Sequence, residues 1–427
     1  MASRFNFILA FSTLVSLLFA SAPGATQAPF NPNALYLPVL KDNATSLLVV
    51  DIYKRTPLKS IPLLVDLNGK FLSVNCEQDY LSSTYNAPIC HSTQCSQVEN
   101  HFCHTCLSQA KPGCHNNTCA VLATNPLTNT NVVSELAQDT LAIKTIEASN
   151  PGPLAVVRYF LFACTPSSFL QGPLPQNVQG IVGFGHNQVS LPRQLASHFG
   201  FPQKFALCLS SKTNQNGVIF LGNASYRIGD KDISQGMQYT PLTIGSQGEY
   251  QILVKSIRIN HKPVQFNRPL LSRTRSFGGT VIGTTDPYTV LEHSIFENFT
   301  QFFTNEFTAI GASQVDPVSP FGVCFNKLPP PVPKVDIAAP IIDFVMENRD
   351  TAWSIYGSNS IVKARPGIWC LAFVDGGYKP RAPIVLGAYQ LEDHIFEFDL
   401  ASSQLGFRVT LKADYNTCDQ FNFNPTP

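Results

Sequence analysis

The feature that most constrains the fold is an internal repeat of two short motifs. In the first half an apolar run reaches Asp66 and turns, and a second apolar run reaches Gly183 roughly a hundred residues later. In the second half a similar run reaches Gly283, and the run at residues 383–386 reaches Gly387. Self-similarity of this kind is typical of one structural unit used twice. We therefore expect a chain of two lobes with related architecture.

Composition indicates what each lobe is built from. The chain has 427 residues, of which 44% are hydrophobic and only 13% charged, with 26 glycines and 32 prolines. This balance favours many short strands joined by turns over helices. The predicted fold class is all-β, with two β-barrel-like lobes and few short helices. Its expected segments are a leader at residues 1–28, an N-terminal lobe at 29–206 that contains a loop-rich segment at 77–120, and a C-terminal lobe at 207–427.

Strands are expected near residues 34–40, 46–53, 61–76, 132–143, 155–163, 180–185, 217–221 and 250–260. One short helix is expected at 190–199, with Ser190 as its N-cap and Pro192 in its first turn. A second is expected at 293–308, where Phe296, Phe299, Phe303 and Phe307 share a face that suits the core better than a ligand site. The proline-rich residues 329–333 are expected to form a surface loop.

The N-terminus reads as a secretory signal. Arg4 precedes an apolar stretch from Phe5 to Ala20, small residues follow, and cleavage is expected between residues 22 and 28. The alternative is a membrane anchor, but the apolar run is short and is interrupted by Asn6, Ser12 and Ser16. Loss of residues 1–28 removes one charge, Arg4, and leaves 28 basic and 28 acidic residues. A neutral chain argues against nucleic acid or an anionic membrane as partner.

Twelve cysteines point to the same oxidising compartment. Six of them lie in the polar segment 77–120, namely Cys90, Cys95, Cys103, Cys106, Cys114 and Cys119. The Cys-x-x-Cys at Cys103 and Cys106, with His91, His101 and His115 near it, suggests a zinc site. A disulfide knot is the preferred interpretation, because the count is even and no second Cys-x-x-Cys is present. No metal and no cofactor are therefore expected. Sequons at Asn43, Asn116, Asn223 and Asn298 predict N-glycosylation.

Several motifs resemble the pepsin-like aspartic protease fold of plants. They are Ser82-Ser83-Thr84-Tyr85, Gly183-Phe184-Gly185, Ser190-Leu191-Pro192 and Phe398-Asp399-Leu400 followed by Gly406-Phe407. Further motifs resemble the subfamily of basic 7S globulins, γ-conglutins and extracellular dermal glycoproteins, which includes plant xylanase and xyloglucanase inhibitors: Lys54-Arg55-Thr56-Pro57-Leu58, Val65-Asp66-Leu67-Asn68-Gly69, Cys90 to Cys95, Pro112-Gly113-Cys114 and Gln390-Leu391-Glu392-Asp393. The resemblance covers residues 33–425. The near-neutral net charge of this chain differs from the positive charge of the basic members of the subfamily.

The resemblance implies three disulfides, Cys76–Cys164, Cys208–Cys418 and Cys324–Cys370. The other six cysteines can pair in 15 ways, among which the sequence does not choose. Some relatives are cut into two chains before the second turn motif. The basic stretch at residues 271–276 is the matching place here, and the Cys208–Cys418 bond would hold the pieces together.

Proteolysis by this fold needs two carboxylates that share a proton. The pepsin-like motif is Asp-Thr/Ser-Gly in each lobe. Here Asp66 is followed by Leu67 and Asn68, and the second aspartate position is Gly283. Asp286 lies three residues further on and is not expected to replace it. No tyrosine occurs between Tyr85 and Tyr159, where a flap tyrosine should fall. The sequence therefore predicts an inactive protease homologue, with Asp66 as a remnant that accepts hydrogen bonds from nearby backbone amides.

The resembled inhibitors insert a cationic side chain between the paired carboxylates of a glycosidase. The residues at the matching loop positions are Arg381 and Lys379, while Gln314 stands where a second inhibitory arginine would be. We expect a secreted inhibitor of microbial glycoside hydrolases of families 11 and 12 in the cell wall. The alternatives are a storage, defence or signalling globulin without inhibitory activity and, least favoured, an active endopeptidase. A homo-oligomer is left open.

Overall fold

The structure is a computed structural model that describes residues 32–147, 150–272, 279–330, 337–347, 351–409, 411 and 416–424. The predicted signal at 1–28, most of the cut site at 271–276 and part of the proline-rich loop lie outside the described residues. In the described part of the chain, no helix is long and apolar enough to cross a lipid bilayer.

One large sheet runs through both halves of the chain. Its strand order is β14 (Gln238–Pro241), β30 (Gln404–Arg408), β29 (Ile395–Asp399), β10 (Lys204–Cys208), β11 (Gly217–Gly222), β1 (Ala34–Lys41), β2 (Leu48–Lys54), β3 (Lys59–Asp66), β9 (Gly180–Gly183), β4 (Leu72–Asn75), β8 (Asn150–Thr165), β7 (Thr130–Glu147), β6 (Thr118–Asn125) and β5 (Phe102–His104). Additional pairings of β7 with β1 and β2 fold the N-terminal strands into a closed barrel. The predicted all-β fold is confirmed.

The strands of the C-terminal half form smaller sheets. A six-stranded sheet has the order β15 (Thr243–Ile244), β16 (Tyr250–Ile252), β19 (Thr280–Ile282), β28 (Ile384–Leu386), β20 (Thr289–Leu291) and β27 (Phe373–Asp375). Two four-stranded sheets are β18 (Lys262–Pro263), β17 (Val254–Ile259), β23 (Ile342–Met346) and β24 (Ala352–Ile355), and β21 (Ser313–Val315), β22 (Cys324–Lys327), β26 (Ile368–Leu371) and β25 (Ile361–Arg365). The hairpin of β12 (Arg227–Ile228) and β13 (Lys231–Asp232) forms a separate two-stranded sheet.

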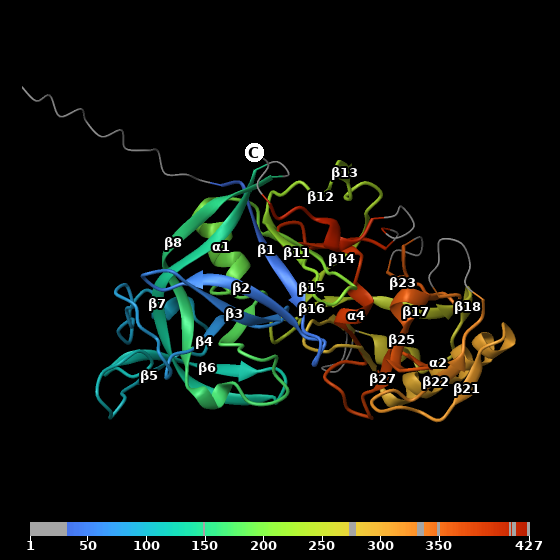
Figure 1. Ribbon diagram of the computed structural model, residues 1–427. Helices are drawn as coiled ribbons and strands as arrows, with labels where there is room; N and C mark the ends of the chain where they lie inside the picture. Colours follow the sequence, from blue (N-terminus) through green and yellow to red (C-terminus); the bar gives the residue numbers. More distant parts are fainter. Residues whose placement is uncertain are drawn as a thin grey trace, which may run out of the picture. The chain divides into compact units, whose positions relative to one another are not determined.

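The two halves share a central set of strands. Figure 1 shows β2 to β8, in blue to green, on one side, and α2 with β17 to β27, in yellow to red, on the other. Between them, β10 pairs with both β11 and β29, so strands from the start, middle and end of the chain lie side by side. The predicted lobe boundary at residue 206 falls inside β10, and it stays a prediction.

Helices are few. They are α1 (Leu191–Phe199), α2 (His293–Ala309), α3 (Gly357–Ser360) and α4 (Ala388–Leu391), with 3₁₀ turns η1 (Cys95–Gln97), η2 (Ser167–Phe169), η3 (Arg268–Leu271) and η5 (Cys418–Gln420). The aromatic stripe of α2 belongs to the core, since Phe299, Phe303 and Phe307 are fully buried and the partly buried Phe296 packs against the same core. The predicted N-cap of α1 and the proline in its first turn are confirmed. Ser190 holds the N-cap position, but its hydroxyl donates to the Asn187 carbonyl instead of accepting from the first turn.

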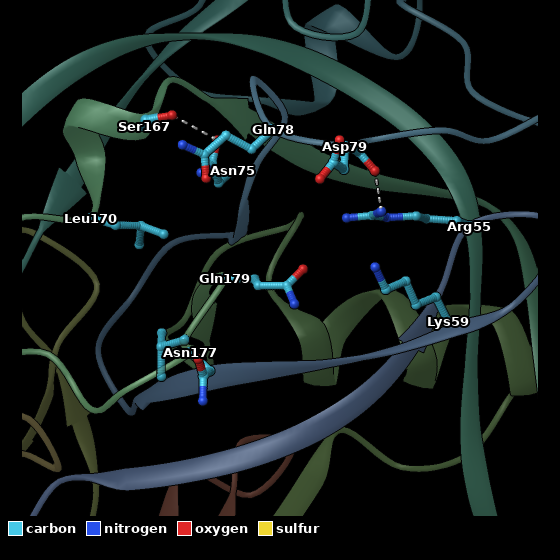
Figure 2. A pocket seen from close by; sticks show the side chains of 10 residues that line it. Arg55, Lys59, Asn75, Gln78, Asp79, Ser167, Leu170, Asn177 and Gln179 are labelled. Atoms are coloured by element: carbon cyan, nitrogen blue, oxygen red, sulfur yellow. Dashed lines mark hydrogen bonds between the residues drawn. The ribbon is translucent and has the colours of Figure 1, made fainter.

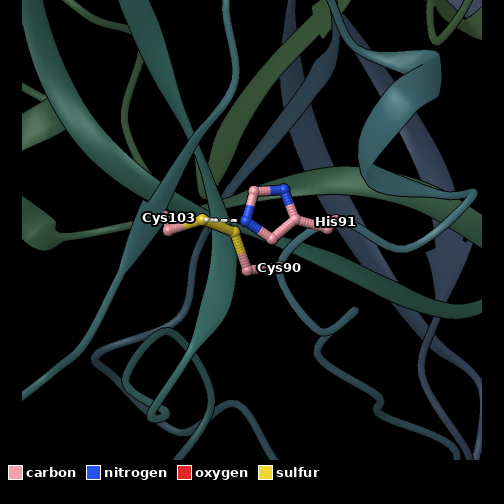
Figure 3. Close-up of side chains that lie close together, drawn as sticks. All are labelled: Cys90, His91 and Cys103. Carbon is pink, nitrogen blue, oxygen red and sulfur yellow. Dashed lines mark hydrogen bonds between the residues drawn. A yellow bond between two sulfur atoms is a disulfide. The ribbon is translucent and has the colours of Figure 1, made fainter.

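Six disulfides use all twelve cysteines. The structure contains Cys76–Cys164, Cys208–Cys418 and Cys324–Cys370, and it pairs the clustered six as Cys90–Cys103, Cys95–Cys119 and Cys106–Cys114. The two cysteines of the Cys-x-x-Cys thus belong to different bonds. His91 Nε2 lies 3.4 Å from the Cys103 sulfur, and Figure 3 shows that this sulfur is already bonded to Cys90. A disulfide sulfur lacks the thiolate charge that holds zinc.

Candidate functional site

Asp66 is the last residue of β3 and lies where two parallel strands run side by side. β3 pairs with β9 in parallel, with Asp66 opposite Gly183. The backbone closes a turn from the Gly69 amide to the Asp66 carbonyl at 3.2 Å, and the Asn68 amide donates to Asp66 Oδ1 at 3.0 Å. A Cβ at Gly183 would lie 2.3 Å from the Gly69 carbonyl oxygen, so only glycine permits this close approach. The strand end therefore holds the carboxylate in a fixed place.

Burial sets the protonation of this carboxylate. Asp66 is 7% exposed, and its burial raises its pKa to about 6. Hydrogen bonds from the Asn68 and Gly69 amides and the charge of Arg381 act in the opposite direction, while the charge of Asp286 raises the pKa further. A carboxylate in an apolar site pays a desolvation cost that these amides offset only in part. Asp66 is thus a buried acid whose electrostatic environment includes Arg381 and Asp286.

The second half contains a corresponding strand pair. β19 pairs with β28 in parallel, with Ile282 opposite Leu386, and the Gly283 amide donates to the Leu386 carbonyl at 2.9 Å. Gly283 comes directly after its strand, as Gly387 does after β28. Where β3 ends in a carboxylate, this strand pair is followed by a residue without a side chain.

Thr284 joins the two strand ends. Its buried hydroxyl accepts a hydrogen bond from the Leu67 amide at 2.9 Å and donates to the Val65 carbonyl at 2.8 Å. These two backbone groups flank Asp66 in the other half of the chain. A single hydroxyl thereby satisfies a buried donor and a buried acceptor that would otherwise each cost stability.

Asn68 makes the reciprocal connection. Its side-chain Nδ2 donates to the Ile282 carbonyl at 2.9 Å, and its Oδ1 accepts from the Tyr250 amide at 3.0 Å. In the Asp-Thr/Ser-Gly motif of the pepsin-like fold the residue after the aspartate carries a hydroxyl, and Leu67 at that position has none. The structure shows that the neighbouring amide of Asn68 reaches across instead. From the sequence alone, Asn68 stands out only as the first residue of an Asn-Gly pair, which is a strong local turn signal.

Asp286 and Arg381 form an ion pair beside Gly283. Arg381 Nη2 donates to Asp286 Oδ2, and the two side chains are 42% and 29% exposed. A Cβ built on Gly283 would lie 2.7 Å from Arg381 Nη2 and 3.2 Å from Asp286 Oδ2. The pair therefore occupies the space that a side chain at position 283 would need. Burial raises the pKa of Asp286, and the guanidinium of Arg381 limits that rise.

Arg381 is carried by the 376–381 loop, which connects β27 to β28. The Gly376 amide donates to the Leu291 carbonyl at 2.8 Å, and the His293 amide donates to the Gly377 carbonyl at 2.9 Å. Asp375 accepts from His293 Nδ1 at 2.7 Å, and this contact raises the pKa of His293. The Tyr378 ring lies 4.4 Å from the His293 ring, yet Tyr378 remains 73% exposed. The loop is thus fixed to the start of α2.

The other predicted loop residues lie at the surface. Lys379 is exposed within the 376–381 loop. Gln314 is exposed in β21, opposite Phe325 of β22, and therefore belongs to a different sheet from β27 and β28. The sequon asparagines Asn43, Asn116, Asn223 and Asn298 are all exposed. The sequence does not predict Asp286 as a replacement for a catalytic aspartate, and it gives no signal that Asp286 is the partner of Arg381, 95 residues away.

These features define a class. The fold is a bilobal β fold in which each half contains one pair of parallel, apolar strands, and the two pairs meet through reciprocal hydrogen bonds. This arrangement is the framework of a pepsin-like aspartic protease homologue. The family comparisons agree: residues 49–223 match the family model described as "Xylanase inhibitor N-terminal", and residues 249–409 match "Xylanase inhibitor C-terminal".

The chain belongs to this xylanase-inhibitor family, together with the γ-conglutins and basic 7S globulins. It is 48% identical to gamma conglutin 1 of Prunus dulcis over 98% of this chain and 96% of that protein. The crystal structure of EDGP matches with a TM-score of 0.90 at 41% identity, covering 93% of this chain and 99% of the other. Conglutin gamma, a basic 7S globulin from lupine seeds, matches with a TM-score of 0.83 at 45% identity, covering 92% and 100%. These names point to a non-catalytic branch of the aspartic protease fold.

Proposed function

We propose that this protein is a secreted, proteolytically inactive inhibitor of microbial glycoside hydrolases, acting in the plant cell wall. The single observation that carries the proposal is the presentation of Arg381. The Arg381 side chain is 42% exposed at the end of an anchored loop, and its hydrogen bond to Asp286 uses only Nη2 among the three guanidinium nitrogens. Membership of the xylanase-inhibitor family supports the choice of target.

The proposal that proteolysis is lost rests on the surroundings of Asp66. We assign Gly283 to the second aspartate position, because it follows β19 as Asp66 ends β3 and is followed by the bridging Thr284. Without a second carboxylate at that point, Asp66 has no partner with which to share a proton. Asp286 does not serve instead, since its carboxylate is occupied by Arg381. One carboxylate cannot be acid and base at once in this reaction.

Inhibition follows from the charge and geometry of the loop. A glycosidase cleft holds two carboxylates at a fixed separation. A guanidinium offers several N–H donors in one plane and suits such a pair better than an ammonium group. Asp286 holds Arg381 in one position, so less side-chain entropy is lost on binding. Exposed Lys379 and Tyr378 extend the same surface.

The test is titration of the purified protein against xyloglucan endoglucanases of family 12 and xylanases of family 11. We expect inhibition of at least one enzyme, a loss of ten-fold or more in Arg381→Ala, and little change in Arg365→Ala, an exposed arginine of β25. If no enzyme is inhibited, the proposal fails. If Arg381→Ala inhibits as well as the wild type, the assignment of the site fails.

Asp286 provides a sharper variant. Because Asp286 holds Arg381 in one position, we expect Asp286→Asn to weaken inhibition, since the guanidinium regains rotational freedom. If the ion pair instead withholds Arg381 from the target, Asp286→Asn strengthens inhibition. Cleavage of denatured globin at acid pH, blocked by pepstatin, would restore the protease alternative.

A second candidate function is a storage or cell-wall defence globulin without inhibitory activity. The names of the relatives favour it, since the conglutin gamma structure is described as a basic 7S globulin from lupine seeds. The internal pairing of Arg381 also suits a protein in which this residue has only a structural task. Accumulation in mature seeds, together with failure to inhibit any enzyme of the two families, would favour this function.

A further inference from the structure

A polar cavity in the N-terminal half lies away from Arg381 and has no part in the proposed inhibition. It has a volume of about 440 Å³, within the range of roughly 300–1,000 Å³ that is typical of small-molecule sites. Its walls come from the residues just after β2, the start of β3, the end of β4 and the segment before β9. Figure 2 shows Arg55 and Lys59 on one side, Asn75 and Gln78 facing them, and Gln179 between. The cavity is therefore built on strand ends of the barrel.

Amide side chains dominate its lining. Asn75, Gln78, Asn177 and Gln179 all line it. Asn75 Oδ1 accepts from the Glu77 amide at 3.0 Å and from the Ser167 hydroxyl at 3.4 Å, which leaves its Nδ2 donor for the cavity. The Asn75 backbone amide donates a hydrogen bond to the Gln179 carbonyl at 2.9 Å, so the backbone holds these two side chains next to each other. Each amide offers two donors and an acceptor, the combination that matches a hydroxyl group.

Two cations share the cavity with one carboxylate. Arg55 is only 3% exposed, and its Nη1 donates to the Asp79 backbone carbonyl at 2.7 Å. Its Nε is buried without a hydrogen-bond partner in the described chain, and its guanidinium carbon lies 4.3 Å from the Tyr80 ring centroid. Lys59 is exposed at the other wall, and Asp79 supplies the one acidic side chain of the lining. A buried arginine held at the wall of a cavity favours an anionic group there.

These two properties together restrict the ligand. A phosphate or sulfate ion would use the cations but would leave most of the volume and the amides unused. The base of a nucleotide needs apolar surface on which to stack, and the apolar residues of the lining are Leu170 and Val178 alone. A molecule with several hydroxyl groups and one carboxylate per ring uses both the amides and the cations. Such a molecule is a sugar acid.

We propose that this cavity binds a uronate residue of an acidic oligosaccharide, with its carboxylate between Arg55 and Lys59 and its hydroxyl groups on Asn75, Gln78 and Gln179. The Lys54-Arg55-Thr56-Pro57-Leu58 motif then has a ligand-binding task through Arg55. The site lies in a different lobe from Arg381 and does not depend on the proposed inhibition of glycoside hydrolases.

The experiment is isothermal titration calorimetry of the full-length secreted protein with trigalacturonate. We expect saturable binding with one site per chain, weakened at least five-fold in Lys59→Gln and in Gln179→Ala. Lys363→Gln, which removes an exposed lysine of β25, is the matched control and should bind as the wild type does. Thermal unfolding of each variant establishes that it is folded. Arg55 is left intact, because loss of a buried cation would disturb the fold.

Three ligands complete the test. The neutral trisaccharide made by reducing the carboxylates of trigalacturonate should bind at least ten-fold more weakly, and equal binding would overturn the role of the cations. Inorganic phosphate should compete only at much higher concentration, and equal potency would overturn the saccharide assignment. Absence of trigalacturonate binding at 10 mM, a concentration of the order at which weak sites with Kd near 1 mM are filled, would overturn the proposal. Arg381→Ala must leave the binding unchanged, which separates this inference from the proposed function.

Discussion

Arg381 and Asp286 form an ion pair in the space next to Gly283. The guanidinium nitrogen Nη2 lies 2.7 Å from the point where a Cβ of residue 283 would be. The pair links the loop after β27 to the turn after β19, two strands of the same six-stranded sheet. An arginine that the sequence presents as a free loop residue is thus also part of the packing around Gly283.

The first prediction concerns Gly283→Ala. The added methyl group would displace the guanidinium from Asp286, so the variant should lose about 1 kcal/mol of unfolding free energy. In an Arg381→Ala background the same substitution should cost little, because the obstacle is gone. A double-mutant cycle by chemical denaturation measures this coupling. Equal costs in the two backgrounds would contradict the arrangement.

A companion variant, Gly283→Asp, restores a carboxylate at the assigned second position. It should remain inactive against denatured globin at acid pH, because Arg381 would pair with the new carboxylate. Pepstatin-sensitive cleavage by this single variant would show that Arg381 does not occupy the site.

The second prediction is a pH dependence set by Asp66. Its folded pKa of about 6 exceeds the ordinary value of 3.8, so the folded chain binds the proton more tightly than the unfolded chain. Stability from this group therefore rises as the pH falls from above 6 to about 4, and the ionised form is penalised at neutral pH. Asp66→Asn should be more stable than wild type at pH 7.5 by on the order of 1–3 kcal/mol.

That advantage should vanish near pH 4, where Asp66 is already protonated in the folded state. Chemical denaturation at pH 7.5 and pH 4 gives the two differences. Asp51→Asn, an exposed position of β2, is the control and should change stability little at either pH. A constant difference for Asp66→Asn across the range would rule out the pKa shift as its cause.

The third prediction tests the hydroxyl that joins the two halves. Thr284→Val keeps the side-chain shape but leaves the Leu67 amide and the Val65 carbonyl without their partner. Because both groups are buried, the loss should be about 1–3 kcal/mol of unfolding free energy. Thr285→Val alters the adjacent, similarly buried residue and should cost less than about 1 kcal/mol. Equal losses of unfolding free energy at the two positions would show that the Thr284 hydroxyl makes no special contribution to stability.

The fourth prediction concerns the cut site at residues 271–276. Leu271 is buried at the end of η3, so a protease should cut after it, within 272–276. The two pieces should stay joined on a non-reducing gel through Cys208–Cys418 and separate on a reducing gel. Protein from native tissue that runs as one full-length chain after reduction would contradict the prediction.

Strand pairing adds a second expectation for the cut form. β10 and β11 precede the cut, and they pair with β29 after it and with β1 before it. The pieces should therefore remain associated after reduction without denaturant, which size-exclusion chromatography measures. Dissociation under these conditions would mean that the disulfide alone holds them.

Features that depend on neighbouring residues and on composition could be predicted from the amino-acid sequence. Periodicity, turn residues and the even number of cysteines predicted four such features. They are the all-β class, the strand that ends at Asp66, the buried stripe of α2 and the use of the cysteines in disulfides. The cap of α1 shows the limit of such rules, because the Ser190 hydroxyl finds the Asn187 carbonyl in the preceding turn.

Asp66 remained the anchor of the site, but its surroundings were decided by tertiary structure. The contacts of Thr284 with Val65, of Asn68 with Ile282 and of Arg381 with Asp286 join residues between 95 and 219 positions apart. The choice among the 15 pairings of the clustered cysteines was likewise decided by tertiary structure, because it depends on where β5 and β6 place the cysteines. Such contacts leave no periodic trace in the sequence, because they depend on how folded strands bring distant side chains together.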